Sequence, residues 1–137
     1  MEKKILIVDD DSDDLALMAF SLNQLGFKTF CYQRAKIALA DIAVIEPDLI
    51  VTDIVMPDME GIQFMSLVKE IYPDMPVMAI SGVATYLEIM RELGATASVP
   101  KTHDFPSYAT QRKISCNNLK KIQHFIERSQ GNYCSIK

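Results

Sequence analysis

Short runs of apolar residues alternate with segments of helical periodicity along most of the chain, and this alternation restricts the fold more than any other feature. The apolar runs are rich in Ile and Val, as expected for strands buried on both faces of a parallel sheet. Strands are predicted at Lys4–Val8, Lys28–Tyr32, Asp48–Thr52, Val77–Ile80 and Ala97–Val99. Such an alternation predicts an α/β fold, in which helices cover both faces of one parallel sheet.

Helices are predicted where apolar residues recur three or four positions apart. We expect helices between the strands, over residues 12–25, 35–45, 62–71 and 83–93, and a last one with its apolar face at Leu119, Ile122 and Ile126. Ser12 is predicted as the N-cap of the first helix, and Leu25 and Ile71 as members of the apolar stripes of the first and third. Five strand–helix units fit one domain with the strand order 2-1-3-4-5.

Length and composition are those of a single globular domain. The chain has 137 residues, of which 49% are hydrophobic and 23% charged. A chain of this size and composition can bury a hydrophobic core without disulfide bonds or bound metals to stabilise it. We expect the domain to span residues 1–130, with an irregular or elongated connection over 103–118 before the last helix. Residues 131–137 are expected to form a tail.

Charge and hydropathy argue against two classes of partner. The net charge of −4 and the isoelectric point near 5.1 argue against direct nucleic-acid binding. The longest apolar run, Leu15–Phe20, is too short to cross a membrane, and the run Ile5–Val8 is too short for a signal peptide. Three cysteines without metal-ligand spacing favour a reducing compartment. We therefore expect a soluble, cytoplasmic protein.

Carboxylates follow two of the predicted strands. Asp9 and Asp10 come directly after the first strand, and Asp53 follows the third. Because parallel strands bring their carboxyl ends to one edge of the sheet, where such folds bind ligands, we expect these side chains to converge. Three converging carboxylates require a cation, and oxygen ligands without nearby His or Cys favour Mg²⁺.

Three further candidate groups, a hydroxyl, a glycine and an ammonium group, follow the fourth and fifth predicted strands. Ser81 and Gly82 come after the fourth strand, and Lys101 follows the fifth. A hydroxyl, a closely approaching backbone amide and a cation are suited to bind a phosphoryl group. Because phosphoryl transfer needs mainly positioning and charge neutralisation, the sequence predicts a Mg²⁺-assisted phosphoryl site.

Each of these residues alone also has an ordinary structural interpretation, since Asp, Ser and Gly are common in turns. Five such groups at strand ends favour a functional site. Other residues are interpreted structurally: Pro57 to Gly61 as a turn, and Asp11, Asp13 and Asp14 as capping and solvated charges. Six methionines are interpreted as core residues: Met56, Met59, Met65, Met75, Met78 and Met90.

The site residues, in this order and spacing, resemble the receiver domain of two-component response regulators. The resemblance runs from about Lys3 to Lys101. It rests on Asp9-Asp10, Asp53-Ile-Val-Met-Pro57-Asp-Met-Glu-Gly61, Ser81-Gly82, Gly94-Ala95 and Lys101. It implies a flavodoxin-like three-layer α/β/α sandwich. It also implies a signalling module rather than an enzyme, one that catalyses only its own aspartyl phosphorylation and dephosphorylation.

The resemblance implies a role for each acidic residue. Asp53 would accept a phosphoryl group from a histidine kinase or phosphotransfer protein. Asp10 would bind Mg²⁺ directly and Asp9 mainly through water, while Asp53 and the Val55 carbonyl would complete the protein ligands.

The resemblance also implies how the modification is relayed. Lys101 would pair with the phosphoryl oxygens, and Ser81, next to Gly82, would move to hydrogen-bond them. This movement would reach the face formed by the fourth helix, the fifth strand and the last helix. The output protein or domain is unknown, and we expect a monomer or weak dimer.

Several positions depart from the family pattern and keep alternatives open. Ser98 stands where Tyr or Phe is usual, and Thr102 where Pro is usual, which favours a pseudo-receiver acting as a constitutive protein-interaction domain. An aspartyl Mg²⁺-dependent phosphatase is disfavoured, because Val55 stands where such an enzyme needs a second carboxylate. Since the aliphatic Val55 and Val83 cannot orient an attacking water, we predict slow self-dephosphorylation.

Overall fold

The computed structural model describes residues 3–54, 59, 61–81, 84–95 and 97–100, all within one compact unit of the chain. Strands and helices alternate throughout this part, as predicted. They are β1 (Lys4–Val8), α1 (Ser12–Gln24), β2 (Lys28–Tyr32), α2 (Ala35–Ile45), β3 (Leu49–Asp53), α3 (Gly61–Ile71), β4 (Val77–Ser81), α4 (Ala84–Glu92) and β5 (Ala97–Pro100).

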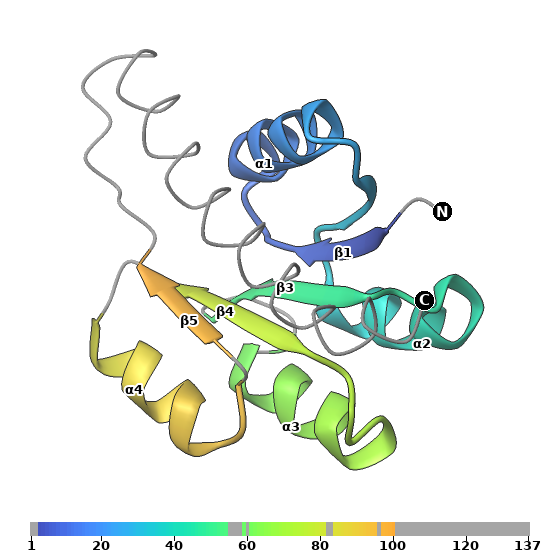
Figure 1. Cartoon of the computed structure of the whole chain (residues 1–137). Helices are drawn as coiled ribbons and strands as arrows, with labels where there is room; N and C mark the ends of the chain where they lie inside the picture. Colours follow the sequence, from blue (N-terminus) through green and yellow to red (C-terminus); the bar gives the residue numbers. More distant parts are fainter. Residues whose placement is uncertain (1–2, 55–58, 60, 82–83, 96, 101–137) are drawn as a thin grey trace, which may run out of the picture. The chain divides into compact units, whose positions relative to one another are not determined.

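The strands form one parallel sheet with the predicted order β2-β1-β3-β4-β5. Figure 1 shows α1 on one face of this sheet and α2, α3 and α4 on the other, which confirms the layered α/β architecture. The order reverses direction between β1 and β3, which pair from Ile5 and Leu49. In folds of this kind, ligands bind at the carboxyl ends of the strands beside such a reversal.

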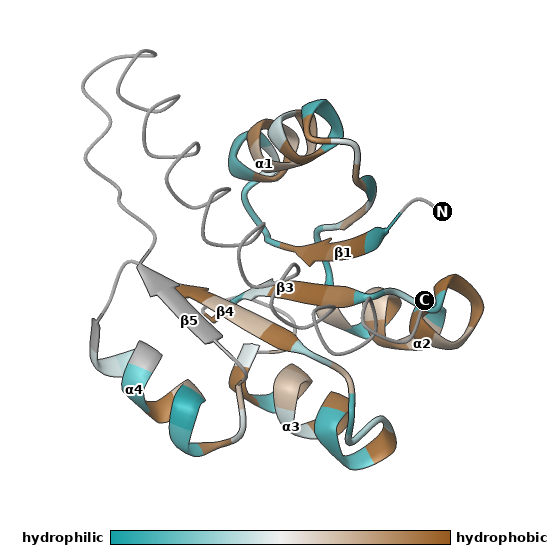
Figure 2. Cartoon of the chain, viewed as in Figure 1, coloured by the Kyte–Doolittle hydropathy of each residue, from teal (hydrophilic) through white to brown (hydrophobic). Residues whose placement is uncertain are grey.

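The main hydrophobic core lies between the sheet and the helices α2, α3 and α4, which cover one of its faces. Leu6 and Val8 of β1 are completely buried there against Phe64 of α3 and other apolar side chains. Strands β1 and β3 accordingly stand out as apolar segments in Figure 2. The interpretation of the methionines as core residues is confirmed for Met59, Met65, Met78 and Met90. Met75 is partly buried and packs against the core, and Met56 lies outside the described residues.

At the amino ends of the strands, Lys4, Ile45 and Asp48 form a hydrogen-bonded group that we call the amino-edge tie. The Lys4 N–H donates to Asp48 Oδ2 (2.8 Å), and the Asp48 N–H donates to the Lys4 carbonyl (2.8 Å). The Lys4 ammonium also donates to the Ile45 carbonyl at the end of α2 (3.0 Å). Because Asp48 is engaged in this tie, β3 spans Leu49–Asp53, one residue later than predicted.

The start of α1 differs from the prediction. Its N-cap is Asp11, whose backbone is extended and whose Oδ1 accepts from the N–H groups of Asp13 (2.9 Å) and Asp14 (3.2 Å). Ser12 is instead the first helical residue, so its assignment as the N-cap was wrong. The interpretation of Asp11 as a capping residue is confirmed.

Two residues predicted on apolar stripes are exposed. Leu25 is 44% exposed and Ile71 55% exposed, because each lies at the C-terminal end of its helix, three residues after the last buried one. The predicted last helix, the connection over 103–118 and the tail lie outside the described residues.

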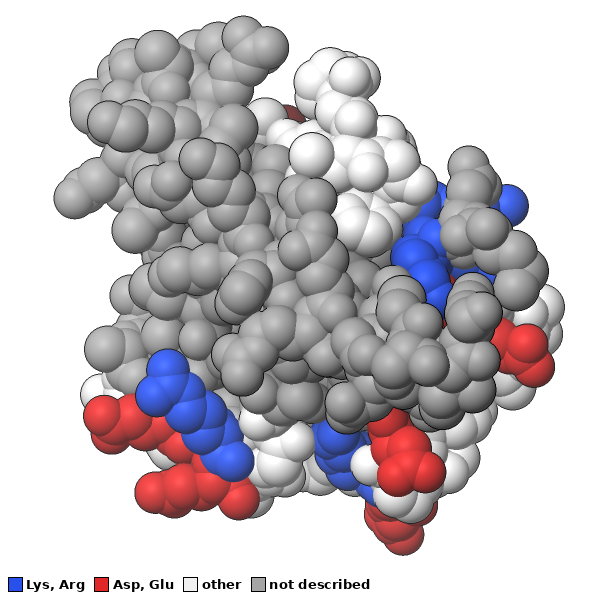
Figure 3. Space-filling model, in the orientation of Figure 1, with Lys and Arg blue, Asp and Glu red and all other residues white. Residues whose placement is uncertain are grey.

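Charged side chains of both signs lie next to one another over α4 (Figure 3). Its exposed charged residues are Glu88, Arg91 and Glu92. Among the helices of the described ranges, none has the length and hydropathy needed to cross a membrane.

Candidate functional site

Asp9 and Asp10 end β1 in different environments. The Asp9 N–H donates to the Tyr32 carbonyl (3.0 Å), which extends the pairing of β1 with β2 by one residue. The Asp9 side chain is completely buried, and its Oδ1 accepts from the Asp11 N–H (3.0 Å), which turns the chain toward α1. Asp10 is exposed. The chain therefore presents one buried, fixed carboxylate beside one that is open to solvent.

Asp53 is the last residue of β3, and its side chain is only 9% exposed. Its Oδ1 accepts from the Ile54 N–H (2.7 Å), so the following peptide fixes the orientation of the carboxylate. The buried Thr52 hydroxyl donates to the Asp53 carbonyl (2.9 Å). The residue and its backbone are thus both held in place.

Gly61 helps to fix Ile54, the residue that follows Asp53. Its N–H donates to the Ile54 carbonyl (2.6 Å) at the point where α3 begins. A Cβ at this position would lie 2.6 Å from Ile54 Cα and would overlap the Asp53 carbonyl oxygen. Only glycine therefore allows α3 to start so close to the end of β3.

Sequence reasoning did not identify the positions that support Asp53. Gly61 was interpreted as part of a turn and counted in the resemblance, but with no role in supporting Asp53, because the close approach depends on how α3 packs and no local pattern shows it. Thr52 left a weak signal, since it is a polar residue in an otherwise apolar strand.

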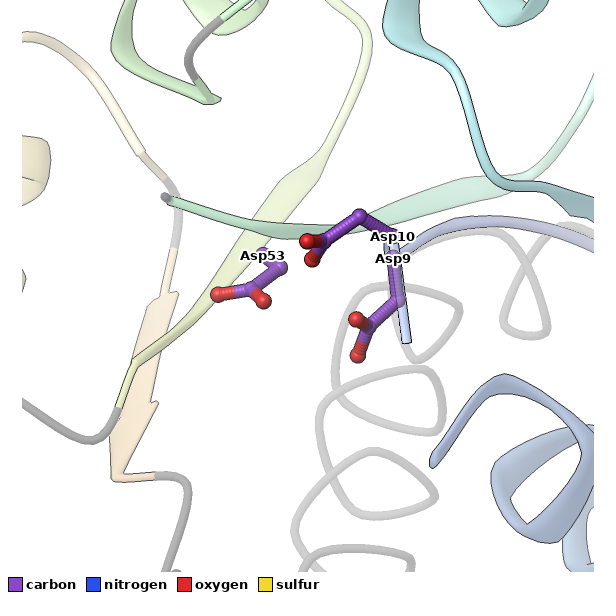
Figure 4. A group of neighbouring side chains, drawn as sticks. All are labelled: Asp9, Asp10 and Asp53. Carbon is purple, nitrogen blue, oxygen red and sulfur yellow. The ribbon is translucent and has the colours of Figure 1, made fainter. Parts of the chain in front are cut away.

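The predicted convergence of the three carboxylates is confirmed. One carboxylate oxygen from each of Asp9, Asp10 and Asp53 lies within 4.8 Å of the others, and Figure 4 shows the Asp10 side chain directed toward Asp53. Carboxylates this close repel one another unless a proton or a cation intervenes. A set of oxygen donors alone fits Mg²⁺, which prefers hard ligands and keeps several of its waters.

Of the remaining predicted site residues, only Ser81 lies within the described part of the chain. It ends β4 and is 2% exposed. Since Asp53 pairs with Ile80, Ser81 is one residue beyond the position opposite Asp53 and lies at the same edge of the sheet. Val55, Gly82 and Lys101 lie outside the described residues.

Comparison with known proteins identifies relatives of the chain. The family model described as the response regulator receiver domain matches residues 5–109. The chain is 32% identical over 127 residues to the regulatory protein AtoC of Escherichia coli (strain K12), covering 88% of this chain and 27% of AtoC. It is 33% identical over 82 residues to the receiver protein CpdR of Brucella abortus (strain 2308), covering 60% and 68%. The chain spans about a quarter of the length of the AtoC and NtrC regulators that it matches.

Solved structures agree with this relationship. A CheY-like response regulator receiver domain protein from Methanospirillum hungatei JF-1 superposes with a TM-score of 0.80 at 26% identity, covering 96% of this chain and 99% of that one. The BeF3-activated DrrB receiver domain superposes with a TM-score of 0.74 at 25% identity, covering 93% and 99%. Together with the sheet order and the three converging carboxylates, these matches show that the chain belongs to the response regulator receiver domain family of two-component signalling.

Proposed function

We propose that this chain is a phosphorylation-controlled signalling module in which Asp53 accepts a phosphoryl group in a Mg²⁺-dependent reaction. The observation that carries the proposal is the grouping of Asp9, Asp10 and Asp53 within 4.8 Å at the carboxyl ends of β1 and β3. An acceptor carboxylate needs a fixed orientation and nearby charge neutralisation. The hydrogen bond from the Ile54 N–H supports the first requirement, and the carboxylates of Asp9, Asp10 and Asp53 support the second because they could hold Mg²⁺.

In the proposed reaction, a carboxylate oxygen of Asp53 attacks the phosphorus of the donor. A P–O bond forms while the bond between phosphorus and the donor breaks, and the leaving group takes the bonding electrons. We propose a phosphohistidine of a histidine kinase or of a phosphotransfer protein as the donor, so that a P–N bond breaks. The buried, hydrogen-bonded Asp53 is oriented for this attack before the donor arrives.

Asp9, Asp10, Asp53 and the Val55 carbonyl are the groups proposed to hold Mg²⁺. When bound, the ion would neutralise negative charge on the transferring phosphoryl oxygens. Lys101, Ser81 and the Gly82 amide are proposed to contact those oxygens. We propose that the signal leaves through the face formed by α4, β5 and the last helix, and that residues 1–130 form a single receiver domain.

Intact mass after incubation with acetyl phosphate and Mg²⁺ tests the proposal. We expect one phosphoryl increment that disappears in Asp53→Ala and when EDTA removes the metal. Asp74→Ala, at an exposed aspartate outside the acidic group, is the matched control and should keep the increment. Turnover of acetyl phosphate without an accumulating increment would point to a phosphatase instead.

A pseudo-receiver that acts as a constitutive binding domain is the second candidate. The observation that favours it is Ser98, which lies in β5 where relatives are expected to carry an aromatic residue. Absence of any increment in the wild-type chain, despite a folded protein, would favour this candidate. If the increment forms, its decay should take minutes or longer, and loss within seconds would contradict slow self-dephosphorylation.

A further inference from the structure

Thr52 is a polar residue in an apolar part of the core. It is completely buried, and so are its partners in the neighbouring strands, Val8 of β1 and Ala79 of β4. Both partners belong to the main core, as does Ile50, which lies two positions before Thr52 on the same side of β3. Valine has a methyl group in place of the hydroxyl and would fit such surroundings without burying a polar group. Packing alone therefore does not account for the hydroxyl of Thr52.

The hydroxyl holds one end of the peptide group between Asp53 and Ile54. It donates to the Asp53 carbonyl (2.9 Å), while the Ile54 N–H at the other end of the same peptide donates to Asp53 Oδ1 (2.7 Å). Because a peptide group is planar, its carbonyl and its N–H cannot turn independently of each other. A rotation of this peptide that breaks the first hydrogen bond therefore also moves the second.

Gly61 restricts the same peptide from the side of α3. A Cβ at Gly61 would overlap the Asp53 carbonyl oxygen, so the backbone of α3 begins directly against that oxygen. This contact only limits how far the carbonyl can move toward α3. The Thr52 hydroxyl attracts the carbonyl and thereby sets the orientation that the peptide keeps.

We propose that Thr52 is a positioning residue for phosphoryl transfer to Asp53. By holding the carbonyl end of the peptide, its hydroxyl directs the Ile54 N–H at the Asp53 carboxylate, which lies beside those of Asp9 and Asp10 (Figure 4). Thr52 acts through the backbone, not by contact with the phosphoryl group. The role rests on the proposed function of Asp53. It matters for rate because a small misplacement of an attacking atom can slow a reaction by as much as about a hundredfold.

Two substitutions at Thr52 separate positioning from packing. Thr52→Val removes the hydroxyl and keeps the packing, whereas Thr52→Ser keeps the hydroxyl and removes a buried methyl group. With acetyl phosphate and Mg²⁺, intact mass should show phosphorylation at least about tenfold slower in Thr52→Val, but within about threefold of wild type in Thr52→Ser. The Tm should follow the opposite order, with a decrease of roughly 3–5 °C in Thr52→Ser and a smaller one in Thr52→Val.

Hydrogen exchange of the Ile54 amide, followed by NMR, tests the positioning without donor or Mg²⁺. We expect exchange at least about tenfold faster in Thr52→Val than in wild type or Thr52→Ser. Thr29→Val is the matched control, because the Thr29 hydroxyl donates to Asn23 Oδ1 (3.0 Å) near the amino end of β2. It should leave both the exchange rate and the phosphorylation rate unchanged.

The possible outcomes distinguish this role from the proposed function. Equal phosphorylation rates in wild type and Thr52→Val, or a Thr52→Ser variant no faster than Thr52→Val, would overturn the positioning role and leave the proposed function standing. Unchanged exchange of the Ile54 amide in Thr52→Val would overturn it as well. A wild type that takes up no phosphoryl group would overturn the proposed function, and this role with it.

Discussion

At the scale of single residues, Ile54, which follows Asp53, is held on both sides. Its N–H donates to the Asp53 carboxylate, and its carbonyl accepts from the Gly61 N–H. Gly61 therefore influences the orientation of the carboxylate through Ile54. Because a Cβ at Gly61 would overlap the Asp53 carbonyl, any larger residue has to displace the backbone that carries the acceptor.

We predict that Gly61→Ala lowers both stability and phosphorylation. The overlap should cost about 1–3 kcal/mol of unfolding free energy, measured by urea denaturation. Gly26→Ala is the matched control: its positive φ of 92° makes Ala costly by about 1–2 kcal/mol, but no atom lies within 4 Å of the new Cβ. Only Gly61→Ala should reduce the phosphoryl increment, and an equal reduction in both variants would contradict a local effect.

Tyr32 is predicted to ionise at unusually high pH. Burial, together with the hydrogen bond to Asp41 and the negative charge of Asp41, raises the pKa of Tyr32 from 10.0 to about 12, and burial is the largest of these causes. The Tyr32 hydroxyl donates to Asp41 Oδ2 (2.7 Å). Because the folded state favours the neutral phenol, the stability that this supplies is present below pH 10 and is lost as the pH rises to about 12.

Phenolate absorbance provides the measurement. The difference between the wild-type and Tyr32→Phe titrations should have a midpoint near pH 12, and Asp41→Asn should move it downward. Circular dichroism must show a folded chain across the same range. A difference titration centred near pH 10 would be inconsistent with a partly buried phenol that is hydrogen-bonded to Asp41.

At the scale of elements, the structure makes Asp11 rather than the adjacent Ser12 the N-cap of α1. Asp11 accepts from two N–H groups of the first turn, whereas Ser12 is already helical. We predict that Asp11→Ala lowers the unfolding free energy by about 1 kcal/mol, while Ser12→Ala changes it by less than about 0.5 kcal/mol. Urea denaturation of both variants decides between them, and the reverse ranking would restore Ser12 as the cap.

The elements themselves could be predicted from the sequence, because apolar period and turn residues are local properties. The bounds of β1, β2 and α2 match the predictions, while β3 is displaced by one residue because Asp48 binds Lys4, a long-range contact. Ser and Asp are equally good N-caps, so the choice depends on where the loop leaves β1. The exposure of Leu25 and Ile71 could not be predicted, because it depends on where along its length each helix stops packing against the sheet.

The acidic part of the site could also be predicted, because the carboxyl-end rule follows from topology alone. It correctly grouped Asp9 and Asp10 with Asp53, which are more than forty positions apart in the sequence. The hydrogen bonds of Asp53 and the close approach of Gly61 could not be predicted, since they depend on the path of the backbone between β3 and α3. The roles of Lys101 and Gly82 stay predictions.

At the scale of the whole molecule, we expect the crowded carboxylates of Asp9, Asp10 and Asp53 to destabilise the folded chain when no cation is bound. We predict that Asp53→Asn raises the Tm without metal by roughly 3–5 °C, equivalent to about 1 kcal/mol, because one of three crowded charges is removed. The amide oxygen of Asn can still accept from the Ile54 N–H. Asp74→Asn, at an exposed site away from the group, should change the Tm little.

In the presence of Mg²⁺, we expect the wild type to have a higher Tm than Asp53→Asn. We expect wild-type Tm to rise with Mg²⁺ concentration, because the ion binds the folded state, with about 2.7 kcal/mol gained at a hundredfold excess over its dissociation constant. Asp53→Asn should gain less, since it has lost a ligand. Differential scanning calorimetry over a Mg²⁺ series measures both effects, and equal increases in the two proteins would exclude Asp53 as a ligand.

The amino-edge tie and the acidic side chains lie at opposite edges of the sheet. Lys4 joins the first and third strands and the end of α2 at the edge opposite the acidic group. These hydrogen bonds hold the register between β1 and β3 at the edge away from the proposed phosphorylation site. If Asp53 is phosphorylated as proposed, we expect the resulting strain to be taken up by the loops and helices at the carboxyl edge, because the tie holds the opposite edge of the sheet.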